Sequence, residues 1–481
     1  MQIERLLLPG RRWAQSLVLP ASSAAASSDV QTHIIVIPGN PGVASFYLTF
    51  AERLHASLGG RCSVRALNLA GFVPGQASRT VHQCNGHDHI HEIPAPLYSL
   101  ADQCEFLTLF LTALHLQLLA ADESSEGDAK NPSDPRVPPA KVVRGILSPI
   151  IVASAAASAA AASCPPRPPP RRQHRFILVA HSIGSYIALA AMRRAKLDQA
   201  AWDKRNGSAS SAAVAISDAS ASAPGAAWSP ALAALGSWLV TSPTLSDWST
   251  PLLPRSVPAL SISHSFLVAP FVRMDLSWLE FRAIRWMLAQ QSWLPGLIAG
   301  LLRLLPFALF RVLLRWGGGI TMPAAVHACR EMFTNSELVR QFAWLGHTEF
   351  QFVLPAQAAK AKPGTVFDPA ILGEHRERLS MLYAGRGRDI WGPPRQMFEF
   401  QALVPQLRAT CVPSISHAWC AVSEEVDCVV REVTKQMLEM KMMEQSHGGD
   451  VSAAASNSKL IVAAAPAPTQ ALSNQLIASR L

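Results

Sequence analysis

The segment FILVAHSIGSYIALAAM, residues 176–192, decides the predicted fold. Its first four residues form a continuous apolar run, which is typical of a strand buried on both faces of a sheet. The run passes through Ser182 into an apolar segment with the composition of a helix, and no loop separates the two. A strand that turns this sharply into a helix exposes the serine hydroxyl above the sheet. The segment therefore predicts a nucleophile elbow with Ser182 at its tip.

The residues around Ser182 meet the steric demand of such an elbow. Strand and helix backbones approach closely there, so the flanking residues must be small. Gly184 meets this requirement after the serine, and Ala180 stands where these motifs usually carry a first glycine. His181 and Gly184 are therefore expected to shape the turn.

The rest of the chain alternates between apolar strands and helical segments. Strands are expected at residues 33–37, 61–69, 379–384 and 409–412, and helices at residues 44–58, 98–121 and 183–194 and from Ser423 onward. Continuous apolar strands separated by helices indicate a parallel sheet with helices on both faces. The predicted fold class is α/β, with a mostly parallel sheet covered by helices.

A serine nucleophile needs a histidine base, and the histidine needs an acid that orients it. In hydrolases with a nucleophile elbow, the chain order is serine, acid, histidine. Asp389 follows the strand that ends at residue 384, and His417 follows the next strand, just before the last helix. Asp368 and Asp427 remain rival candidates for the acid. The expected catalytic residues are Ser182, Asp389 and His417.

An oxyanion hole requires two N–H donors near the nucleophile. One is expected to be the Ile183 N–H, at the start of the helix. The other should come from the loop after an early strand, and HIIVIPGNPG, residues 33–42, contains such a loop. Gly39 and Gly42 allow its backbone to approach the substrate closely, and the Asn40 N–H is the best candidate donor.

Several motifs together resemble the lipid droplet-associated hydrolase family, an α/β-hydrolase family. They are IPGNPG with the following Phe46 and Tyr47, HSIGSY around the nucleophile, Asp389-Ile390-Trp391, SHAW at 416–419, LNLAGF at 67–72 and YSLADQCEFLTLFL at 98–111. The resemblance covers about residues 33–121 and 175–445. It implies an α/β-hydrolase fold with a Ser–Asp–His triad, association with lipid droplets and the endoplasmic reticulum, and a lipid ester as substrate.

The composition limits the classes of protein that the chain can belong to. It has 481 residues, of which 49% are apolar, so disorder throughout is excluded. Its eight cysteines are scattered without a repeated pair, which in a chain this long indicates reduced thiols facing the cytosol rather than a disulfide framework. The 42 basic and 33 acidic side chains give a net charge of +9. Such a balance could suggest nucleic acid binding, so the location of the charge matters.

The excess positive charge lies on an apolar segment. Residues 281–330 contain six arginines and no acidic residue, among many leucines and aromatic residues. Aliphatic content of this kind favours a membrane or droplet surface over nucleic acid. Residues 293–314 are expected to form one helix that lies in the lipid interface, with residues 278–290 as the other arm of a hairpin. The expected membrane-binding residues are Trp293, Leu297, Leu301, Leu305, Phe307 and Phe310, with Arg303, Arg311 and Arg315 within one arc of the helix.

The domain organisation follows from these segments and from stretches rich in Ala, Ser and Pro. We expect an N-terminal extension (1–32), hydrolase core (33–121), a low-complexity insertion (122–174), further core with the elbow and a second insertion at 207–227 (175–249), a helical cap that binds membrane or droplets (250–350), core with the acid and histidine loops (351–445) and a disordered tail (446–481). The insertions contribute no strand and no catalytic residue.

The segment VHQCNGHDHIHE, residues 81–92, is rich in metal-ligating side chains. Alternating histidines at 82, 87, 89 and 91, with a cysteine at 84, could chelate zinc or copper. No strand or helix fixes their geometry in the predicted scheme. We therefore expect a solvated loop, no metal and no cofactor.

Two functions remain open at this point. The first is an esterase that acts on a lipid, such as a sterol ester or an acylglycerol, at an interface. The second is a droplet-surface scaffold protein that retains the hydrolase fold with little or no lipase activity. A dehalogenase is disfavoured because it needs an aspartate at the elbow, where this chain has Ser182. The sequence indicates no nucleic acid partner and identifies no protein partner.

Overall fold

The structure is a computed structural model of the chain. It describes residues 1–8, 12–26, 30–73, 78–84, 87–93, 96–129, 172–212, 259–273, 284, 286, 294–352, 369–387 and 389–448. Met1–Val433 forms one compact unit, which holds the sheet and the candidate site. Thr434–Leu481 forms a second, of which residues 434–448 are described and helical.

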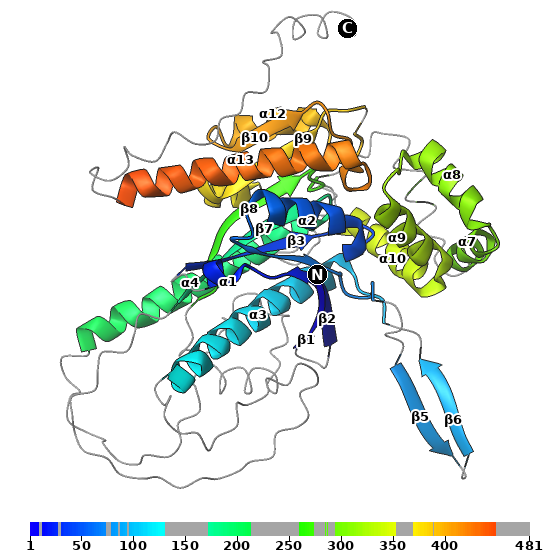
Figure 1. The fold of residues 1–481 in the computed structure, drawn as a ribbon, viewed down its shortest axis with the longest axis horizontal. Coiled ribbons are helices and arrows are strands. Elements are labelled where there is room, and N and C mark those ends of the chain that lie inside the picture. Colours follow the sequence, from blue (N-terminus) through cyan, green and yellow to red (C-terminus); the bar gives the residue numbers. More distant parts are fainter. Residues whose placement is uncertain are drawn as a thin grey trace, which may run out of the picture. The chain divides into compact units, whose positions relative to one another are not determined.

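An eight-stranded sheet forms the centre of the first unit (Figure 1). Its strands, in spatial order, are β1 (Gln2–Leu8), β2 (Arg12–Leu19), β4 (Ser63–Leu67), β3 (Val30–Ile37), β7 (Gln173–His181), β8 (Ile262–Val268), β9 (Leu379–Ala384) and β10 (Arg408–Val412). β2 runs antiparallel to both of its neighbours, and all the other pairs are parallel. β3 and β7 are buried almost throughout and pair from Val30↔Gln173 to Ile37↔Ala180.

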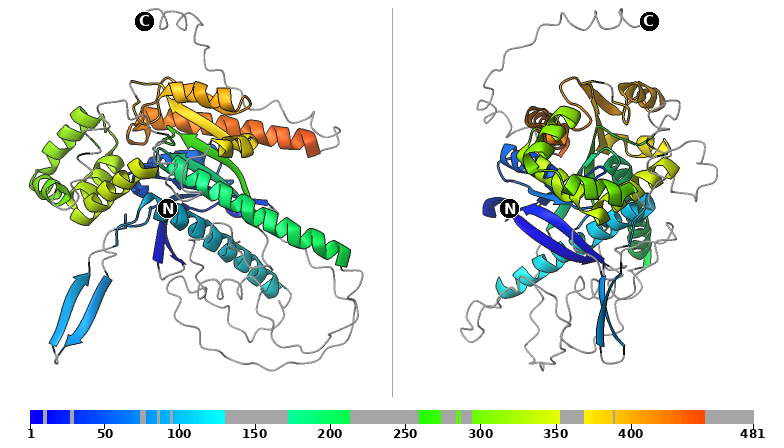
Figure 2. Two further views of the ribbon diagram at one scale, coloured as in Figure 1. Left: turned by 180° about the vertical axis from the view of Figure 1, so that it is seen from behind. Right: turned by 90° about the vertical axis from the view of Figure 1, so that its right-hand side faces the viewer.

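Helices cover both faces of this sheet (Figures 1 and 2). The longer ones are α2 (Leu48–Ser57), α3 (Leu100–Ala129), α4 (Gly184–Ala212), α12 (Pro394–Leu403) and α13 (Ser423–Gly448); short ones are α1 (Ser23–Ala26), α11 (Ala370–Glu374), η2 (Ala44–Tyr47), η4 (Arg376–Arg378) and η5 (Trp419–Ala421). Arg53 of α2 donates to Ser423 O at 2.9 Å and to Asp427 Oδ1 at 2.6 Å, which fastens α2 to the start of α13.

The strand order reverses direction at β3. The chain passes from β3 outward to β4 and then returns across β3 to β7. Because parallel crossovers are right-handed, this reversal sends α2 and α3 to opposite faces of the sheet. A crevice opens outside the carboxyl ends of the strands where such a reversal occurs. The loops that follow β3 and β7 meet at this point, and both were predicted to carry site residues.

The predicted α/β class, with a mostly parallel sheet and helices on both faces, is confirmed by this topology. The strand predicted at residues 379–384 agrees with β9, and the helix predicted to begin at Ser423 is α13. Seven strands run in one direction with β2 opposed, and the elbow follows the central β7. This arrangement is the α/β-hydrolase fold.

Residues 1–32 are not merely an extension, because β1 and β2 within them join the sheet. β2 presents Ala14, Ser16 and Val18 to the core, while the residues between them are more exposed. Two of these three buried side chains are small or polar, so the apolar alternation that usually reveals a half-buried strand is weak here.

The predicted cap begins too early, because β8 lies within residues 250–350. The sequence of β8, ISHSFLV, places three polar residues, Ser263, His264 and Ser265, among the apolar ones. The structure buries both His264 and Ser265, and His264 Nε2 pairs with Ser380 Oγ at 3.0 Å on the neighbouring β9. The predicted insertions also begin too early, since α3 continues to Ala129 and α4 to Ala212. Their remaining residues (130–171 and 213–227) and the tail beyond 448 lie outside the described residues.

The described residues of the cap form four helices, α7 (Leu294–Arg303), α8 (Phe307–Gly318), α9 (Pro323–Thr334) and α10 (Ser336–Phe352). Figures 1 and 2 show α7 and α8 on the side of α9 and α10 that faces away from the sheet. Gln341 of α10 exchanges two hydrogen bonds of 2.8 Å with the backbone of Tyr98. The N–H groups of Thr321 and Met322 donate to Ala421 O at 3.2 Å. These bonds attach the inner cap helices to the hydrolase body.

Residues 293–314 do not form the single helix expected from the sequence. α7 and α8 are separated by a break at residues 304–306, and their axes bend by 118°. Pro306, the residue before α8, cannot donate the hydrogen bond that would continue α7. Arg303 therefore belongs to one helix and Arg311 and Arg315 to another, so the single arc predicted for the three arginines is wrong.

The histidine-rich segment predicted as a loop contains two strands. β5 (Ser78–Cys84) and β6 (His87–Ile93) pair antiparallel in a separate two-stranded sheet. The side chains of this hairpin lie outside the described part of the structure. Among the side chains that are described, no group of three or more His, Cys, Asp or Glu residues could hold a metal ion.

Candidate active site

Ser182 lies directly after β7 in a sharp turn that opens α4. Its φ angle is +52°, in the left-handed region that a residue with a side chain rarely adopts. The surrounding structure holds this conformation: Ser182 N donates to Val268 O at 3.2 Å, and Phe271 N donates to Ser182 O at 3.1 Å. The turn thus has the strained geometry that a nucleophile elbow requires.

The loop after β3 packs directly on this turn. A Cβ atom added to Gly39 would lie 2.8 Å from Ser182 Cβ, and one added to Gly184 would lie 2.5 Å from Pro38 O. Both positions therefore need glycine because the two backbones touch. Ala180, in place of a first glycine, is fully buried in register with Ile37 of β3.

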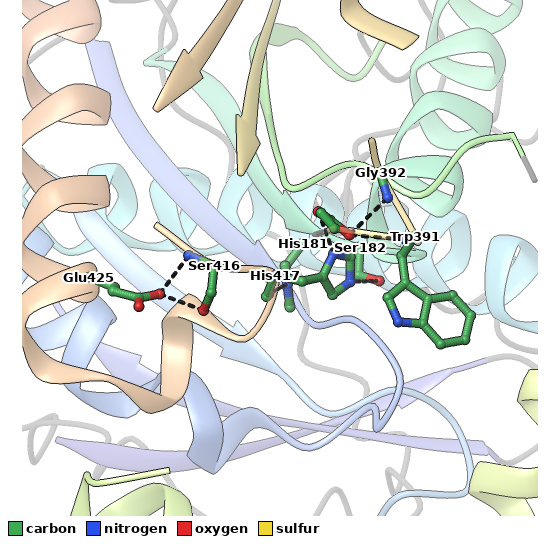
Figure 3. A network of polar contacts seen from close by, with 8 residues as sticks. His181, Ser182, Trp391, Gly392, Ser416, His417 and Glu425 are labelled. Atoms are coloured by element: carbon green, nitrogen blue, oxygen red, sulfur yellow. Dashed lines mark hydrogen bonds and ion pairs between the residues drawn. The ribbon is translucent and has the colours of Figure 1, made fainter. Parts of the chain in front are cut away.

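His417 joins the predicted nucleophile to the predicted acid (Figure 3). Its Nε2 lies 2.9 Å from Ser182 Oγ, and its Nδ1 lies 3.0 Å from Asp389 Oδ2. Since a carboxylate only accepts, Nδ1 carries the proton and Nε2 accepts the hydrogen bond from the serine hydroxyl. The three residues come from loops after three different strands, β7, β9 and β10.

Asp389 is held as an ionised, fully buried carboxylate. Its other oxygen accepts hydrogen bonds from Trp391 N at 2.9 Å and Gly392 N at 3.1 Å, the two contacts drawn at the right of Figure 3. Burial by itself would raise the pKa of Asp389, but the hydrogen bond and charge of His417, together with these N–H groups, lower the pKa below its ordinary value. Of the rival acids, Asp427 pairs with Arg53 on the surface, and Asp368 lies outside the described residues.

The predicted oxyanion residues lie on the two loops that pack together. Ile183 follows Ser182, and Asn40 lies in the loop after β3, next to Gly39. The Asn40 side chain binds the cap, since its Nδ2 donates to Phe342 O at 3.2 Å and its amide also lies within hydrogen-bonding reach of the buried Glu349 carboxyl. Gly42 follows in the same loop, where an added Cβ would lie 2.5 Å from Leu69 Cβ.

Glu425, within the helix predicted from Ser423 onward, is a site residue that the sequence did not single out. Its carboxylate accepts hydrogen bonds of 2.7 Å from both the N–H and the hydroxyl of Ser416 and pairs with Arg386 at 2.7 Å. Figure 3 shows Glu425 reaching from α13 to the residue before His417. No local pattern could reveal this role, because the partner residues lie 9 and 39 positions away.

A small cavity of about 130 Å³ lies elsewhere, between the edge of the sheet and cap helix α9. Asn68, Phe72 and Met332 are among the residues that line it, and none of Ser182, Asp389 and His417 does. It is too small for a lipid acyl chain and is therefore separate from the candidate site.

The expected membrane-binding residues differ in their exposure. Leu297 and Leu301 are half exposed, and the side chains of Arg303, Arg311 and Arg315 are also exposed. Phe310 is 3% exposed, so its predicted contact with a membrane is wrong: it packs inside the protein. Leu305 is partly buried, and Phe307 stacks on His327 with ring centroids 5.1 Å apart. Trp293 and most of residues 278–290 lie outside the described residues.

Other apolar side chains, on α7, on α8 and in the break between them, are also exposed. Leu304 is 80% exposed and Trp316 is 86% exposed, and Leu309, Val312 and Leu313 are each close to half exposed. By length and hydropathy, two described segments could cross a membrane: α3 from Leu100 to Asp122, and the bent pair α7–α8. The α3 segment is mostly buried, as expected for a core helix. The α7–α8 pair instead carries its apolar side chains outward.

A family model described as lipid-droplet associated hydrolase matches residues 30–126 and 168–420. The chain belongs to this family. The segments that carried the predicted resemblance all lie within the match. Membership makes the chain a hydrolase associated with lipid droplets, which implies a lipid substrate. The matched residues stop at the edges of the long stretch between α3 and β7 and before the C-terminal tail.

Solved structures with a similar course of the chain are distant in sequence. A thermophilic esterase from Thermogutta terrifontis is 11% identical, with 91% of this chain and 99% of that chain covered and a TM-score of 0.42. The haloalkane dehalogenase DatA from Agrobacterium tumefaciens (11% identical, 91% and 96% covered) has a TM-score of 0.44, and the peroxisomal α/β-hydrolase Lpx1 from Saccharomyces cerevisiae (10% identical, 91% and 85% covered) has 0.39. Structural similarities as low as these give no information about the reaction of this chain. A comparison with curated protein sequences finds no match.

Proposed function

We propose that this lipid-droplet associated hydrolase is a serine esterase that cleaves a carboxylic ester of a lipid. Ser182 is the nucleophile, His417 the general base and Asp389 the acid that orients the histidine. The observation that carries this proposal is the position of His417, 2.9 Å from the serine hydroxyl and 3.0 Å from a buried carboxylate. This arrangement is the one by which a serine hydroxyl becomes a nucleophile at neutral pH.

The reaction proceeds in two acyl-transfer steps. Ser182 Oγ attacks the ester carbonyl carbon while its proton passes to His417 Nε2, and the resulting imidazolium is stabilised by Asp389. The negative charge on the former carbonyl oxygen is met by the N–H groups of Asn40 and Ile183. The tetrahedral intermediate collapses with transfer of the proton to the leaving alcohol. A water molecule, deprotonated by His417, then releases the fatty acid and restores Ser182.

The lipid surface is bound through α7 and α8. Their outward side chains include Leu301, Leu304 and Trp316, each more than half exposed. Apolar side chains of this kind insert among acyl chains, while Arg303 and Arg311 remain at the level of the headgroups. The bend of 118° favours two short helices lying on the surface over one straight helix that spans it.

The protein lies on lipid droplets and on the endoplasmic reticulum, faces the cytosol and takes part in lipid storage or turnover. The six cysteines whose side chains the structure describes are free thiols, which suits a reducing compartment. The cap (α7–α10) and the core that carries the loops of Ser182, Asp389 and His417 act as separate functional regions. No cofactor takes part in the reaction.

The direct test compares wild-type protein with Ser182→Ala. Purified protein is incubated with a fluorophosphonate probe and, separately, with p-nitrophenyl and lipid esters. Wild type is expected to be labelled and to hydrolyse ester, and Ser182→Ala to lose both activities. Ser57→Ala, at the end of α2, is the matched control and should retain them.

The scaffold alternative makes a different prediction in the same experiment. If folded wild-type protein binds droplets but is neither labelled nor active on any ester, the esterase proposal is wrong and the scaffold function is preferred. Labelling that persists in Ser182→Ala would also overturn the assignment of the nucleophile.

A further inference from the structure

A second set of hydrogen bonds lies behind the proposed triad and connects Tyr47, His181 and His417. Gly39 N donates to the Tyr47 hydroxyl at 2.9 Å, and this hydroxyl lies 2.6 Å from His181 Nδ1. On the opposite side of the ring, His181 Nε2 lies 2.7 Å from the backbone O of His417. The bonds cross 134 and 236 positions of the sequence. They join the loop after β3, the elbow and the loop that carries the histidine base.

The direction of every bond in this chain is fixed. A backbone carbonyl only accepts, so His181 Nε2 must carry the ring proton. His181 Nδ1 is then bare and accepts the Tyr47 hydroxyl proton, while the Tyr47 oxygen accepts the N–H of Gly39. One tautomer of His181 therefore satisfies all the polar groups in this chain of hydrogen bonds at once.

The buried surroundings keep His181 and Tyr47 in these protonation states. Burial lowers the pKa of His181 to about 3, and the proton that His417 takes up during the reaction would act in the same direction, so the ring stays neutral. Burial also raises the pKa of Tyr47 well above its ordinary value, so the hydroxyl stays protonated. The fully buried Trp419 ring meets His181 and Tyr47 edge-on, with centroids 5.5 and 6.1 Å away.

We propose that Tyr47 and His181 are positioning residues, which hold the oxyanion loop and the His417 backbone at fixed places relative to Ser182. This inference rests on the proposed function, since it concerns how the esterase machinery is aligned. Neither side chain touches the reacting atoms. His181 acts on His417 through the backbone carbonyl, and Tyr47 acts on Asn40 through the N–H of the adjacent Gly39.

Packing alone does not account for these two residues. Buried polar side chains that serve only to fill space can remain without partners, as Tyr383 does: its hydroxyl is buried on β9 and has no hydrogen-bond partner among the described residues. In contrast, the Tyr47 hydroxyl and both ring nitrogens of His181 are paired, and each pair joins a different loop of the site.

The kinetic test uses Tyr47→Phe, His181→Gln and His181→Leu. We expect Tyr47→Phe and His181→Leu to lower kcat on a soluble ester about 10- to 100-fold, with KM changed less than about threefold, because misplacement of reacting groups by a fraction of an ångström has effects of this size. His181→Gln can still donate to the His417 carbonyl and should recover much of the loss. The double variant Tyr47→Phe/His181→Leu should be no worse than His181→Leu, since both act along one chain.

The matched controls are Tyr383→Phe, which removes an unpartnered buried hydroxyl, and His264→Gln, which changes a buried histidine on β8. Both should keep wild-type kcat. Thermal unfolding of each variant separates misfolding from misalignment. Wild-type kcat in folded Tyr47→Phe and His181→Leu, or losses that simply multiply in the double variant, would overturn the proposal.

A spectroscopic test is independent of turnover. In protein labelled with ¹⁵N-histidine, the signals lost in His181→Gln identify His181. They should show a bare Nδ1 and a protonated Nε2 from pH 5 to 8, and Tyr47→Phe should shift the Nδ1 signal. A proton on Nδ1 would overturn the proposal even in an active enzyme. If wild type proves inactive, the esterase function fails, whereas this measurement still decides whether the chain of hydrogen bonds exists.

Discussion

Two buried carboxyl groups near the site have pKa values shifted in opposite directions. Asp389 accepts hydrogen bonds from Trp391, Gly392 and His417, which together outweigh the effect of burial and lower its pKa. Glu349 is fully buried on α10 and has only the Asn40 amide to oppose the effect of burial, which raises its pKa to about 8. Hydrogen-bond donors thus decide which carboxyl carries charge at neutral pH.

Asp389→Asn tests the role of the ionised carboxyl. Asparagine keeps the size of the side chain but cannot stabilise the imidazolium, and its amide favours the wrong tautomer of His417. We expect kcat on a soluble ester to fall about 10²- to 10⁴-fold, as in other triads, while the protein stays folded. Steady-state kinetics together with the circular dichroism spectrum check this outcome. Near wild-type kcat would show that a different acid serves His417.

Glu349→Gln should stabilise the protein at alkaline pH. An unfolded glutamate ionises near pH 4.5, whereas the folded group keeps its proton to about pH 8, so the stability contributed by Glu349 falls as pH rises through this window. Glutamine cannot ionise. Its advantage in the free energy of unfolding should be about 2–4 kcal/mol larger at pH 8 than at pH 5. Urea unfolding at both pH values measures this, with the exposed Glu331→Gln as control; an equal effect at both would contradict a neutral Glu349.

At the level of single residues, the sequence predicted a role only for residues whose position relative to a strand reveals that role. Ser182, Asp389 and His417 each follow a strand, and this position allowed their contacts to be anticipated. Tyr47 and Glu425 could not be assigned roles in the same way. Their partners lie far away in the sequence or in the backbone, and only the packed fold brings them together.

At the level of elements, strands with continuous apolar residues were predictable, and strands with polar or small buried residues were not. The core of β7 is apolar throughout and β9 has Ser380 as its one small polar residue, whereas β2 and β8 bury serine, alanine or histidine at several positions. The bend between α7 and α8 was missed for another reason. Apolar and arginine spacing fits one helix across residues 293–314, but Pro306 interrupts the backbone hydrogen bonds that such a helix needs.

The outward faces of α7 and α8 should determine droplet binding. Replacing Leu301, Leu304 and Trp316 together by serine removes the three most exposed large apolar side chains of the α7–α8 segment and should shift the protein from droplets to the cytosol. Hydrolysis of a soluble ester should stay within about twofold of wild type. Microscopy of cells fed with fatty acid, and flotation with artificial droplets, measure the shift.

The matched control for this triple variant replaces Ile3, Phe398 and Leu403, which are each about as exposed as Leu301 but lie away from the cap. This control should stay on droplets. Equal loss of binding in both triple variants would mean that exposed hydrophobicity in general, and not α7 and α8, holds the protein at the surface.

At the level of the whole molecule, buried neutral histidines set the acid limit of stability. Burial lowers the pKa of both His33 and His264 to about 3. An unfolded histidine binds a proton below about pH 6.5, so stability is full above that pH and falls as pH drops toward 3. Each such histidine lowers the free energy of unfolding by about 2 kcal/mol between pH 7.5 and 5. Urea unfolding of His264→Gln should show a smaller decrease than wild type; an unchanged decrease would contradict a neutral His264.

The two insertions should be dispensable for the fold and the reaction. Residues 130–170 enter before the amino end of β7, and Ser182 lies at its carboxyl end, roughly 25 Å away at 3.3 Å per residue. Deletion of residues 130–170 or 213–226 should therefore leave the thermal unfolding midpoint and kcat on a soluble ester near wild type. Insoluble protein from either deletion would mean that these residues support the core.

The order of the site along the chain has a consequence for synthesis. The helices with outward apolar faces, α7 and α8, end at Gly318, whereas Asp389 and His417 come roughly 70 and 100 residues later. At the usual 5–20 residues per second, the ribosome needs about 5–20 seconds to translate the segment from Gly318 to His417. A nascent chain therefore presents the apolar faces of α7 and α8, which we propose to bind lipid, while Ser182 still lacks both Asp389 and His417. Each molecule can therefore contact a membrane before it is able to hydrolyse an ester there.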